Sequence, residues 1–561
     1  MKKHIYTVIV LLGAFLFASC LKDYEDINKN PLFPDDKMKS YDGVAGGSYF
    51  ISFEKMVIPT RSAEGEGTDL PNRYQVAINL AGDNWCGYMS PMNNKWNNGT
   101  NFTTYYMVDG WVSYAFGTYY TQIVNPWMQI KDQTHIKKVE KGKVSYEKKA
   151  LPDQAIFSVA QIIKIMGLHR ATDTYGPLPY SEVGSGDLKI AYDHQELIYK
   201  SFFKELQEAV ETLQEIRNKG TEIIDALADF DAVYFGQVEK WMKLANSLML
   251  RLALRVRYVD QDLSQQWATR AVTNPAGVMT SEADAAMLNN SGGHNFLNSI
   301  QLLWKEYDDC RMGATIYCYL KGYDDPRGSA YFTKFEKDPD AFQLKGVRSG
   351  IPMSENSDQY KNYSIPNIFN ETPVYWFKAS EVSFLKAEAA LYHLIPGSAK
   401  DFYEEGIRTS FRENNVKVGD YLQNRATPSD YYDKVMPGYN AGRPSTVSVR
   451  WEDAQNDEQR LEKIITQKYL AIYPDGQEAW TEWRRTGYPR QIPVYVNSTD
   501  ATHGNVVDSD GYKYGVRRII FPRAEYEGIN AENVKKAAGL LSSGVDDCNA
   551  RLWWDANPAL N

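Results

Sequence analysis

The chain of 561 residues lacks most of the features that mark an enzyme, a nucleic-acid-binding protein or a disulfide-rich protein. Its five cysteines are too few for a disulfide framework, and their spacing matches no zinc-binding pattern. It has no basic block, and a formal net charge of −9 argues against nucleic-acid binding. After residue 20 no apolar run approaches the ~18 residues that a membrane-spanning helix needs. There is also no HExxH, GxSxG or phosphate-loop motif.

The first twenty residues read as a bacterial export signal. Two lysines are followed by an apolar run over Ile5–Phe17, and Ala18-Ser19 then precede Cys20. The last four of these residues resemble the lipobox of bacterial lipoproteins, although Phe17 stands where Leu is more usual. We therefore expect a signal peptide over 1–19, lipidation at Cys20 and a tether over 20–40. The alternative is a plain signal peptide with an incidental cysteine.

Acidic residues directly follow Cys20, in the order Leu21-Lys22-Asp23-Tyr24-Glu25-Asp26. This arrangement resembles the signal that sends some outer-membrane lipoproteins to the cell surface. A solvated linker would have the same composition. The remaining cysteines could still form one pair in an oxidising compartment, and the sequence does not say which: Cys86, Cys310, Cys318 and Cys548.

Helical periodicity dominates two long stretches, about 105–275 and 380–487. Breakers such as Gly176-Pro177 and Pro396-Gly397 separate helices into pairs with a period of roughly 35–45 residues, which is typical of helix–turn–helix repeats. We expect a mainly α, tetratricopeptide-like scaffold within one domain over 41–561. The predicted helices cover 111–131, 152–175, 195–218, 240–258, 263–274, 380–393, 400–414, 457–473, 477–485 and 531–541. Arg517–Phe521 reads as a strand.

Residues 276–378 lose this periodicity and form a loop-rich insertion between the two helical stretches. Long loops between helical arrays commonly carry function, so we expect the ligand face here. The 39 tyrosines and 13 tryptophans outnumber the 22 phenylalanines, and such amphipathic rings suit partly wet binding surfaces. Core packing is the alternative for each ring. The candidate ligand-binding residues are the aromatics in loop-rich segments: Trp85, Trp96, Trp304, Tyr307, Tyr331, Tyr360 and Trp376.

Other candidates for chemistry have simpler interpretations. His169 reads as a helix-end histidine with one hydrogen bond, and Asp325 belongs to an Asp-Pro turn. Arg251, Arg255 and Arg257 suit the dipole at a helix C-terminus and surface ion pairs. The residues after Asp508 resemble the start of a calcium loop but lack the later ligands. We therefore assign no catalytic residue, metal or cofactor, and whether calcium supports a loop stays open.

Several stretches together resemble the SusD/RagB family of nutrient-binding outer-membrane lipoproteins, in the family's order and over nearly the whole chain. They are DINKNP (26–31), DTYGPLPY (173–180), KWMKLANSLMLRLALR (240–255), DPR (325–327), SEVSFLKAEAA (380–390), ITQKYL (465–470), EAWTEWRRTGYP (478–489), and RR with FP (517–518 and 521–522).

This resemblance implies a lid on a SusC-like TonB-dependent transporter of the outer membrane. Such a protein captures oligosaccharide, or in some cases peptide, at a face built from loops and delivers it inward. The helical scaffold would contact the transporter. The matched motifs fall on scaffold helices, so we expect structural ion pairs at Glu388, Glu478, Arg484 and Arg485.

Four functions remain in competition. The first is a surface glycan-binding subunit of a transporter complex, and the second is the same architecture binding peptides. The third is a lipid-anchored hydrolase, which the absence of catalytic motifs disfavours. The fourth is a structural lid whose transporter supplies most of the binding site. The sequence does not specify the ligand's identity, linkage or length.

Overall fold

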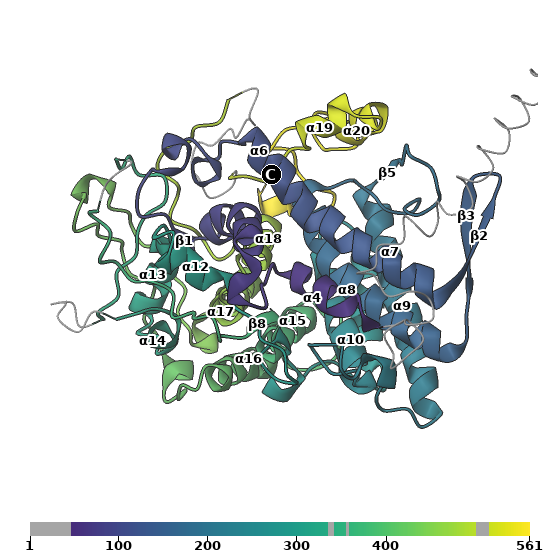
Figure 1. Cartoon of the computed structure of the whole chain (residues 1–561). Coiled ribbons are helices and arrows are strands. Elements are labelled where there is room, and N and C mark those ends of the chain that lie inside the picture. The colour runs from purple at the N-terminus through teal and green to yellow at the C-terminus, as the bar shows by residue number, and fades with distance from the viewer. Residues whose placement is uncertain (1–46, 335–341, 355–357, 501–514, 561) are drawn as a thin grey trace, which may run out of the picture.

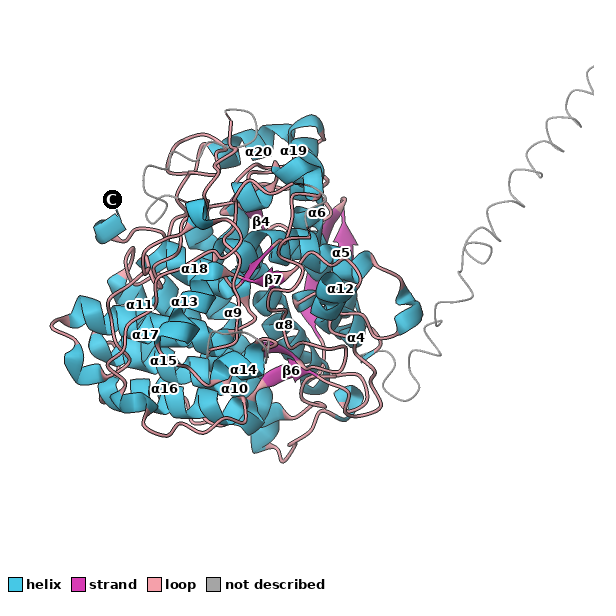
Figure 2. Ribbon diagram, turned by 90° about the vertical axis from the view of Figure 1, so that its left-hand side faces the viewer, coloured by secondary structure: helices cyan, strands magenta, loops and turns pink. Residues whose placement is uncertain are grey.

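The computed structural model describes residues 47–334, 342–354, 358–500 and 515–560. The expected signal peptide, tether and Cys20, together with the calcium-like residues 508–511, lie outside these ranges. The described residues form a mainly α structure in which helices pack on helices and the strands are short (Figure 2). The predicted fold class is therefore confirmed.

The helical scaffold follows the predicted pattern closely. The helix α9 (Gln195–Asn218) begins and ends where its apolar spacing does, and its Phe202, Leu206 and Leu213 are buried. The helix α8 (Leu151–Tyr175) ends at Gly176, whose φ of +85° favours glycine and is followed by a proline. The other scaffold helices are α6 (Asp109–Phe116), α7 (Gln122–Thr134), α10 (Val238–Arg255), α11 (Gln261–Thr273), α15 (Ala379–Leu391), α16 (Ala399–Glu413), α17 (Asp457–Ile472) and α18 (Gly476–Thr486).

These helices pack mainly as neighbours in sequence, α8 with α9, α10 with α11 and α15 with α16. In Figure 1 α8, α9 and α10 lie on the right, and α15, α16 and α17 lie to their left. Successive helical pairs that bury a shared face are the packing expected for a tetratricopeptide-like array. Two π-helical stretches, Gln75–Asp83 and Gly117–Thr121, continue α5 (Asp69–Tyr74) and α6 respectively.

The structure adds elements that periodicity did not reveal. The helix α4 (Phe50–Val57) packs on α7 and α8, and a hairpin of β2 (His135–Glu140) and β3 (Lys143–Lys148) extends from α7. The segment 276–378 also contains more regular structure than a loop-rich insertion. It holds α12 (Ser299–Lys305), α13 (Ala314–Gly322), α14 (Arg327–Tyr331), β6 (Ala286–Leu288), β7 (Arg311–Met312) and β8 (Val374–Phe377).

Further strand pairs among the described residues join separate segments of the chain. β1 (Met89–Ser90) pairs with β7, β4 (Leu178–Pro179) with β5 (Tyr192–Asp193), and β6 with β8, all antiparallel. Two of these pairs, β1–β7 and β6–β8, bring together segments far apart in sequence. The tail holds α19 (Arg523–Glu527) and α20 (Ala531–Ala538). The strand predicted over Arg517–Phe521 is wrong, because its backbone makes isolated bonds, such as Arg517 N to Cys548 O at 2.8 Å, instead of a ladder.

A network of buried charges lies where α10, α15, α17 and α18 meet. Arg255 donates to both Glu478 (2.7 Å) and Glu482 (3.0 Å), and Arg251 donates to Glu381 at 2.6 Å. Lys468 lies 3.1 Å from Glu478. The arginines at the end of α10 were predicted to make surface pairs, and this was wrong for Arg251 and Arg255, which are 1% and 0% exposed.

The predicted structural ion pairs are confirmed for three of the four residues. Arg485 donates to Glu388 and to Glu482, each at 2.7 Å, and Glu478 pairs as described above. Arg484 instead donates to the carbonyls of Asp173 and Arg517 and lies 3.4 Å from the centre of the Trp480 ring. Burial without a carboxylate partner, together with repulsion by Arg517, lowers the pKa of Arg484 to about 9.

Candidate functional site

Four of the seven predicted ligand-binding aromatics are buried in the core. Trp85 is 4% exposed; its indole N–H donates to the carbonyl of Phe102 at 2.7 Å, and its ring lies 4.7 Å from that of Trp480 on α18. It therefore joins the N-terminal loop region to the scaffold. A ring enclosed in this way offers no face to a ligand, so we withdraw Trp85 as a candidate.

Tyr331, Tyr360 and Trp376 are 4%, 0% and 1% exposed. The hydroxyl of Tyr331 donates to Leu470 O on α17 at 2.8 Å, and that of Tyr360 donates to Asp433 at 2.8 Å. Trp376 lies in β8 within the main core. Each hydroxyl partner is distant in the sequence, which is why a loop-like local pattern suggested exposure. These three residues serve packing.

Trp96 has a different environment, in a loop that is closed by its own hydrogen bonds. Asn97 and Asn98 both have positive φ, and Asn101 donates to the carbonyl of Trp96 at 2.6 Å. The ring is half-buried, and its indole N–H donates to Asp309 at 2.5 Å. Asparagine tolerates the left-handed region better than most residues, so the sequence itself stabilises this tip. The loop thus presents Trp96 in a fixed orientation.

Tyr307 lies beside this loop, just after α12. Its hydroxyl donates to Asn72 on α5 at 2.7 Å, and its carbonyl accepts a hydrogen bond from the Lys95 ammonium. Asp309, two residues further on, accepts from Trp96 and from Gln75 at 2.6 Å. One short segment therefore holds both rings in place. The half-buried Tyr307 remains a candidate, as does Trp96.

Tyr114 on α6 completes the group, although no sequence pattern indicated it. Its hydroxyl donates to Asp69 at 2.8 Å, and the Arg73 guanidinium lies 4.8 Å from its ring centre. Burial and the bond to Asp69 raise the pKa of Tyr114 to about 12. Asp69 and Asn72, which accept from Tyr114 and Tyr307, lie three residues apart on α5, so the two phenols are near each other. We call the rings of Trp96, Tyr307 and Tyr114 with the polar side chains of Asn72, Arg73 and Lys95 the aromatic face.

Trp304 is also half-buried, one helical turn before Tyr307. Its indole N–H donates to the carbonyl of Ile368 at 2.8 Å, and its ring meets that of Phe369 edge-on at 5.8 Å. Phe369 is 49% exposed, which is unusual for a phenylalanine. This pair extends the partly exposed aromatic surface next to α12. The role of Trp304 in ligand binding therefore stays a prediction.

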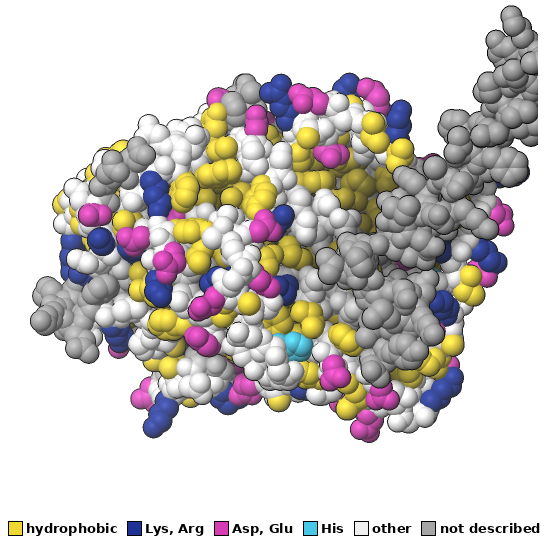
Figure 3. All heavy atoms as spheres, viewed as in Figure 1, with side chains coloured by type: hydrophobic (Ala, Val, Ile, Leu, Met, Phe, Trp, Pro, Cys, Tyr) yellow, Lys and Arg dark blue, Asp and Glu magenta, His cyan; other side chains and the backbone are white. Residues whose placement is uncertain are grey.

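The electrostatics of the aromatic face are mild. Burial raises the pKa of Asp309 to about 6, although Lys95 and the indole of Trp96 oppose this. Arg73 pairs with Asp69 at 2.9 Å. Figure 3 shows Lys and Arg interspersed with Asp and Glu on one side of the molecule, without a continuous field of either sign. The arrangement suits a ligand recognised by ring contact and hydrogen bonds more than one recognised by charge.

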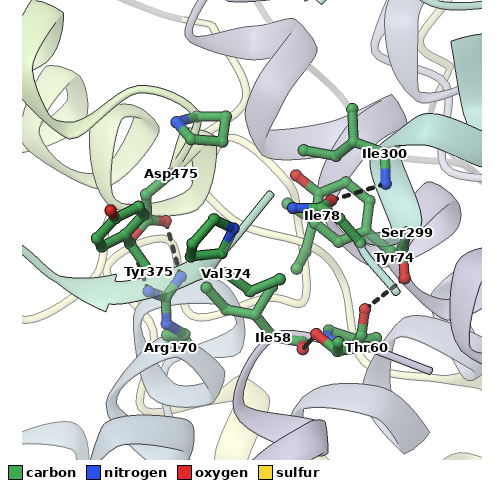
Figure 4. Close-up of a pocket in the computed structure, with 14 residues that line it drawn as sticks. Ile58, Thr60, Tyr74, Ile78, Arg170, Ser299, Ile300, Val374, Tyr375 and Asp475 are labelled. Atoms are coloured by element: carbon green, nitrogen blue, oxygen red, sulfur yellow. Dashed lines mark hydrogen bonds and ion pairs between the residues drawn. The ribbon is translucent and has the colours of Figure 1, made fainter. Parts of the chain in front are cut away.

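The interior of the protein offers too little space for a glycan. A cavity of about 30 Å³ lies between the end of α4, α5, α12 and β8, with the Arg170–Asp475 ion pair in its wall (Figure 4). This is room for one or two water molecules, so a sugar ring would not enter it. Within the described ranges, no group of three or more His, Cys, Asp or Glu side chains is placed to hold a metal ion.

The other sequence motifs have structural roles. His169 is buried inside α8, with its Nδ1 2.8 Å from Ile165 O and its Nε2 3.4 Å from the Arg251 guanidinium. The prediction of a helix-end histidine with a single hydrogen bond was therefore wrong in both details, although the role is structural. Asp325 closes its turn by pairing with Arg327 at 2.6 Å. Among the described residues, the four cysteines left open above are buried thiols that form no disulfide with one another: Cys86, Cys310, Cys318 and Cys548.

The comparison with known families identifies this architecture. The model of the SusD-like family, described as SusD and RagB outer membrane lipoprotein, matches residues 26–555. The chain belongs to this family. The predicted family resemblance is thereby confirmed. In the part of the chain that the structure describes, no helix is both long and apolar enough to cross a membrane.

Solved structures of family members are similar over most of the chain. A chitin-binding SusD homolog from Flavobacterium johnsoniae is 33% identical with a TM-score of 0.80, covering 91% of this chain and 98% of that one. A SusD homolog from Bacteroides thetaiotaomicron is 32% identical (TM-score 0.77; 91% and 99%). One from Bacteroides vulgatus is 31% identical (TM-score 0.77; 91% and 98%).

Proposed function

We propose that this protein is a surface-exposed lipoprotein that captures oligosaccharide at its aromatic face. The observation that carries the proposal is the shared anchoring of Trp96 and Tyr307. The Tyr307–Asp309 segment fixes one ring directly and the other through the 2.5 Å bond from the indole to Asp309. A rigid, half-buried pair of rings loses little conformational entropy when a ligand binds.

The chemistry of the aromatic face matches that of a sugar. A pyranose ring presents C–H groups on its flat sides and hydroxyls at its edge. Tryptophan and tyrosine supply apolar faces for the first, while Asn72, Arg73 and Lys95 supply hydrogen-bonding groups for the second. The fold thus supports glycan binding without any deep pocket.

The chitin-binding relative from Flavobacterium johnsoniae gives the ligand panel its starting point. We therefore place oligosaccharides of N-acetylglucosamine first, followed by other neutral glycans. Linkage and chain length are to be determined by the measurement.

The anchor and the partner complete the proposal. The family description as an outer membrane lipoprotein supports lipidation at Cys20 and attachment to the outer membrane. The acidic residues that follow Cys20 favour an orientation facing the cell exterior. A SusC-like TonB-dependent transporter would receive the captured oligosaccharide. Co-purification of that transporter with the tagged protein tests this part, and a Cys20→Ser variant that still partitions with the membrane would contradict lipidation.

Titration calorimetry of the chain beginning after Cys20 tests the binding function. Saturable heat with one class of glycan is expected, and Trp96→Ala should weaken the affinity at least about tenfold if the ring is a central contact. Trp451→Ala is the matched control. Trp451 is also half-buried, but it packs on Tyr403 of α16 within the helical scaffold, at 5.2 Å. The two variants should differ in binding and not in folding.

The remaining hypotheses are outcomes of the same screen. Heat only with a peptide digest would establish the peptide-binding alternative and contradict the glycan assignment. Release of shorter products from any glycan or peptide would establish a hydrolase. Binding that appears only in the transporter complex would mean that the transporter supplies most of the site.

A further inference from the structure

A hollow lies at the foot of the β2–β3 hairpin. It is separate from the aromatic face and from the small cavity of Figure 4. It has a volume of about 380 Å³. In Figure 1 the hairpin lies at the right-hand edge, while β1 and α12, which precede Trp96 and Tyr307, lie on the left. Its walls come from the end of α7, the hairpin and the loop 181–185. The side chains relevant here are Lys131, His135, Tyr146, Lys148, Glu182 and Ser185.

The register of the hairpin places its cations on two different faces. His135 is opposite Lys148, and Lys137 is opposite Tyr146, so these four side chains share the face that borders the hollow. Lys138 is on the other face and pairs there with Glu147. The charge of Lys138 is therefore balanced by the carboxylate of Glu147 on the neighbouring strand.

The cations at the hollow are compensated less well. Lys137 pairs with Asp132 at 2.9 Å, and Asp132 also accepts a hydrogen bond from Tyr146 at 2.5 Å. Lys131 lies over two rings, 4.4 Å from the centre of Tyr146 and 5.0 Å from that of Trp127. Among the described residues, neither Lys131 nor Lys148 has a carboxylate within 4.0 Å.

Neighbouring cations act on both Lys131 and His135. Burial and the neighbouring Lys164 lower the pKa of Lys131, while the more distant Glu205 and Asp132 oppose this. Burial, Lys131, Lys148 and Lys149 together lower the pKa of His135. Lys164 itself is neutralised by Glu205 at 2.7 Å, behind the hollow. An anion placed between Lys131 and Lys148 would offset this accumulation of positive charge without displacing an existing ion pair.

We propose that this hollow binds an oxyanion, a phosphate, sulfate or carboxylate group, between the ammonium groups of Lys131 and Lys148. The hydroxyl of Ser185, which accepts a bond from Asp187 N at 3.3 Å, keeps its own proton to donate. Glu182 is the opposing carboxylate in the lining, and it favours an anion held on the lysine side. The group would belong to an acidic glycan or to a phospholipid head group. This proposal does not depend on glycan binding at the aromatic face.

Calorimetry at constant ionic strength tests it with four probes. These are inorganic phosphate, glucuronate, and vesicles of phosphatidylcholine with or without phosphatidylglycerol. Lys148→Gln removes an exposed cation at the hollow, and Lys131→Met removes the other while keeping contact with the rings. Lys143→Gln is the matched control, because it removes one cation from the same hairpin on the face of Lys138. Each change at the hollow should weaken binding roughly tenfold, as expected for a charge-assisted hydrogen bond.

The outcomes separate the sources of the anion. Saturable binding of phosphate or glucuronate that is weakened at the hollow and unchanged in the control supports a soluble ligand. Binding confined to phosphatidylglycerol vesicles, with the same variant pattern, supports a lipid head group. Equal weakening by Lys143→Gln, or no saturable binding to any probe, would overturn the proposal.

Discussion

Between α10, α15, α17 and α18 the charged side chains are buried and paired with one another, whereas at the aromatic face they lie around half-buried rings. Arg255 and Glu478 are almost inaccessible to solvent. Trp96 and Tyr307, in contrast, keep part of their surface open while hydrogen bonds fix their polar atoms. The first arrangement fixes the positions of helices, and the second leaves ring surface for a ligand. Stability and binding should therefore respond to different mutations.

The largest effect on stability is expected from Glu478→Ala. This change leaves Arg255 and Lys468 buried beside a missing carboxylate, and breaking such a pair typically costs about 3–5 kcal/mol. Denaturant unfolding of the purified variant measures the loss. Glu532→Ala is the control, since its pair with Lys535 on α20 is exposed and should leave the unfolding midpoint unchanged. An equal midpoint for both variants would show that the buried network does not stabilise the scaffold.

A pH dependence is expected at the junction of the two regions. Asp83 ends the π-helical stretch next to Gly476 of α18, and burial raises its pKa to about 8. A raised carboxyl pKa gives stability that is complete below the unfolded value and is lost as pH rises through the folded one. Asp83→Asn should therefore gain about 3–4 kcal/mol relative to the wild type between pH 5 and 8, since each pH unit between the two pKa values contributes about 1.4 kcal/mol.

Denaturant unfolding at three pH values measures this difference. The exposed Asp187→Asn is the control, and its difference from the wild type should stay constant. A difference for Asp83→Asn that is flat between pH 5 and 8 would mean that Asp83 is ionised in the folded protein.

Two tryptophan substitutions separate packing from binding most clearly. Trp85→Phe loses the bond to Phe102 O and leaves a void beside Trp480, so it should cost about 1–2 kcal/mol of stability. Glycan affinity should stay unchanged in that variant. Trp96→Phe keeps a smaller ring and should weaken affinity several-fold with little loss of stability. Both quantities are measured on the same samples, and a binding defect in Trp85→Phe alone would reverse the assignment.

The smallest effect is expected from Tyr307→Phe. It removes the hydroxyl that donates to Asn72 and keeps the ring. Because this bond holds the ring in its orientation, the affinity for glycan should fall by about 0.5–1.5 kcal/mol. Calorimetry with the best glycan measures the change. If Tyr307→Ala weakened binding no further than Tyr307→Phe, the ring itself would not contact the ligand.

The scaffold was predictable because each helix carries its own local signal. The apolar spacing of α9 and the breakers after Tyr175 define their helix ends within single segments of sequence. The β2–β3 hairpin was missed because its exposed strands lack the usual apolar alternation. Its turn has positive φ at both Lys141 and Gly142, a conformation for which Asn-Gly or Asp-Gly is the usual sequence signal.

The candidate binding residues were harder to predict because the burial of a side chain depends on partners that are distant in the sequence. Trp85 and Trp96 occupy similar polar, turn-rich sequence. One meets Trp480 on α18, while the other meets Asp309 beside a surface loop. Tyr114 lies on a helix and gave no signal at all. Residue type and local spacing indicate which rings are available, and the tertiary contacts decide which of them remain partly exposed.

Hydroxyl-radical footprinting of the glycan complex, read by mass spectrometry, tests the central claim most directly. Saturating glycan should protect Trp96 and Tyr307 from oxidation, whereas Trp451 on the scaffold and the exposed Tyr432 should stay unchanged. Protection at Trp451 or Tyr432 without protection at Trp96 would contradict the assignment of the aromatic face as the ligand site.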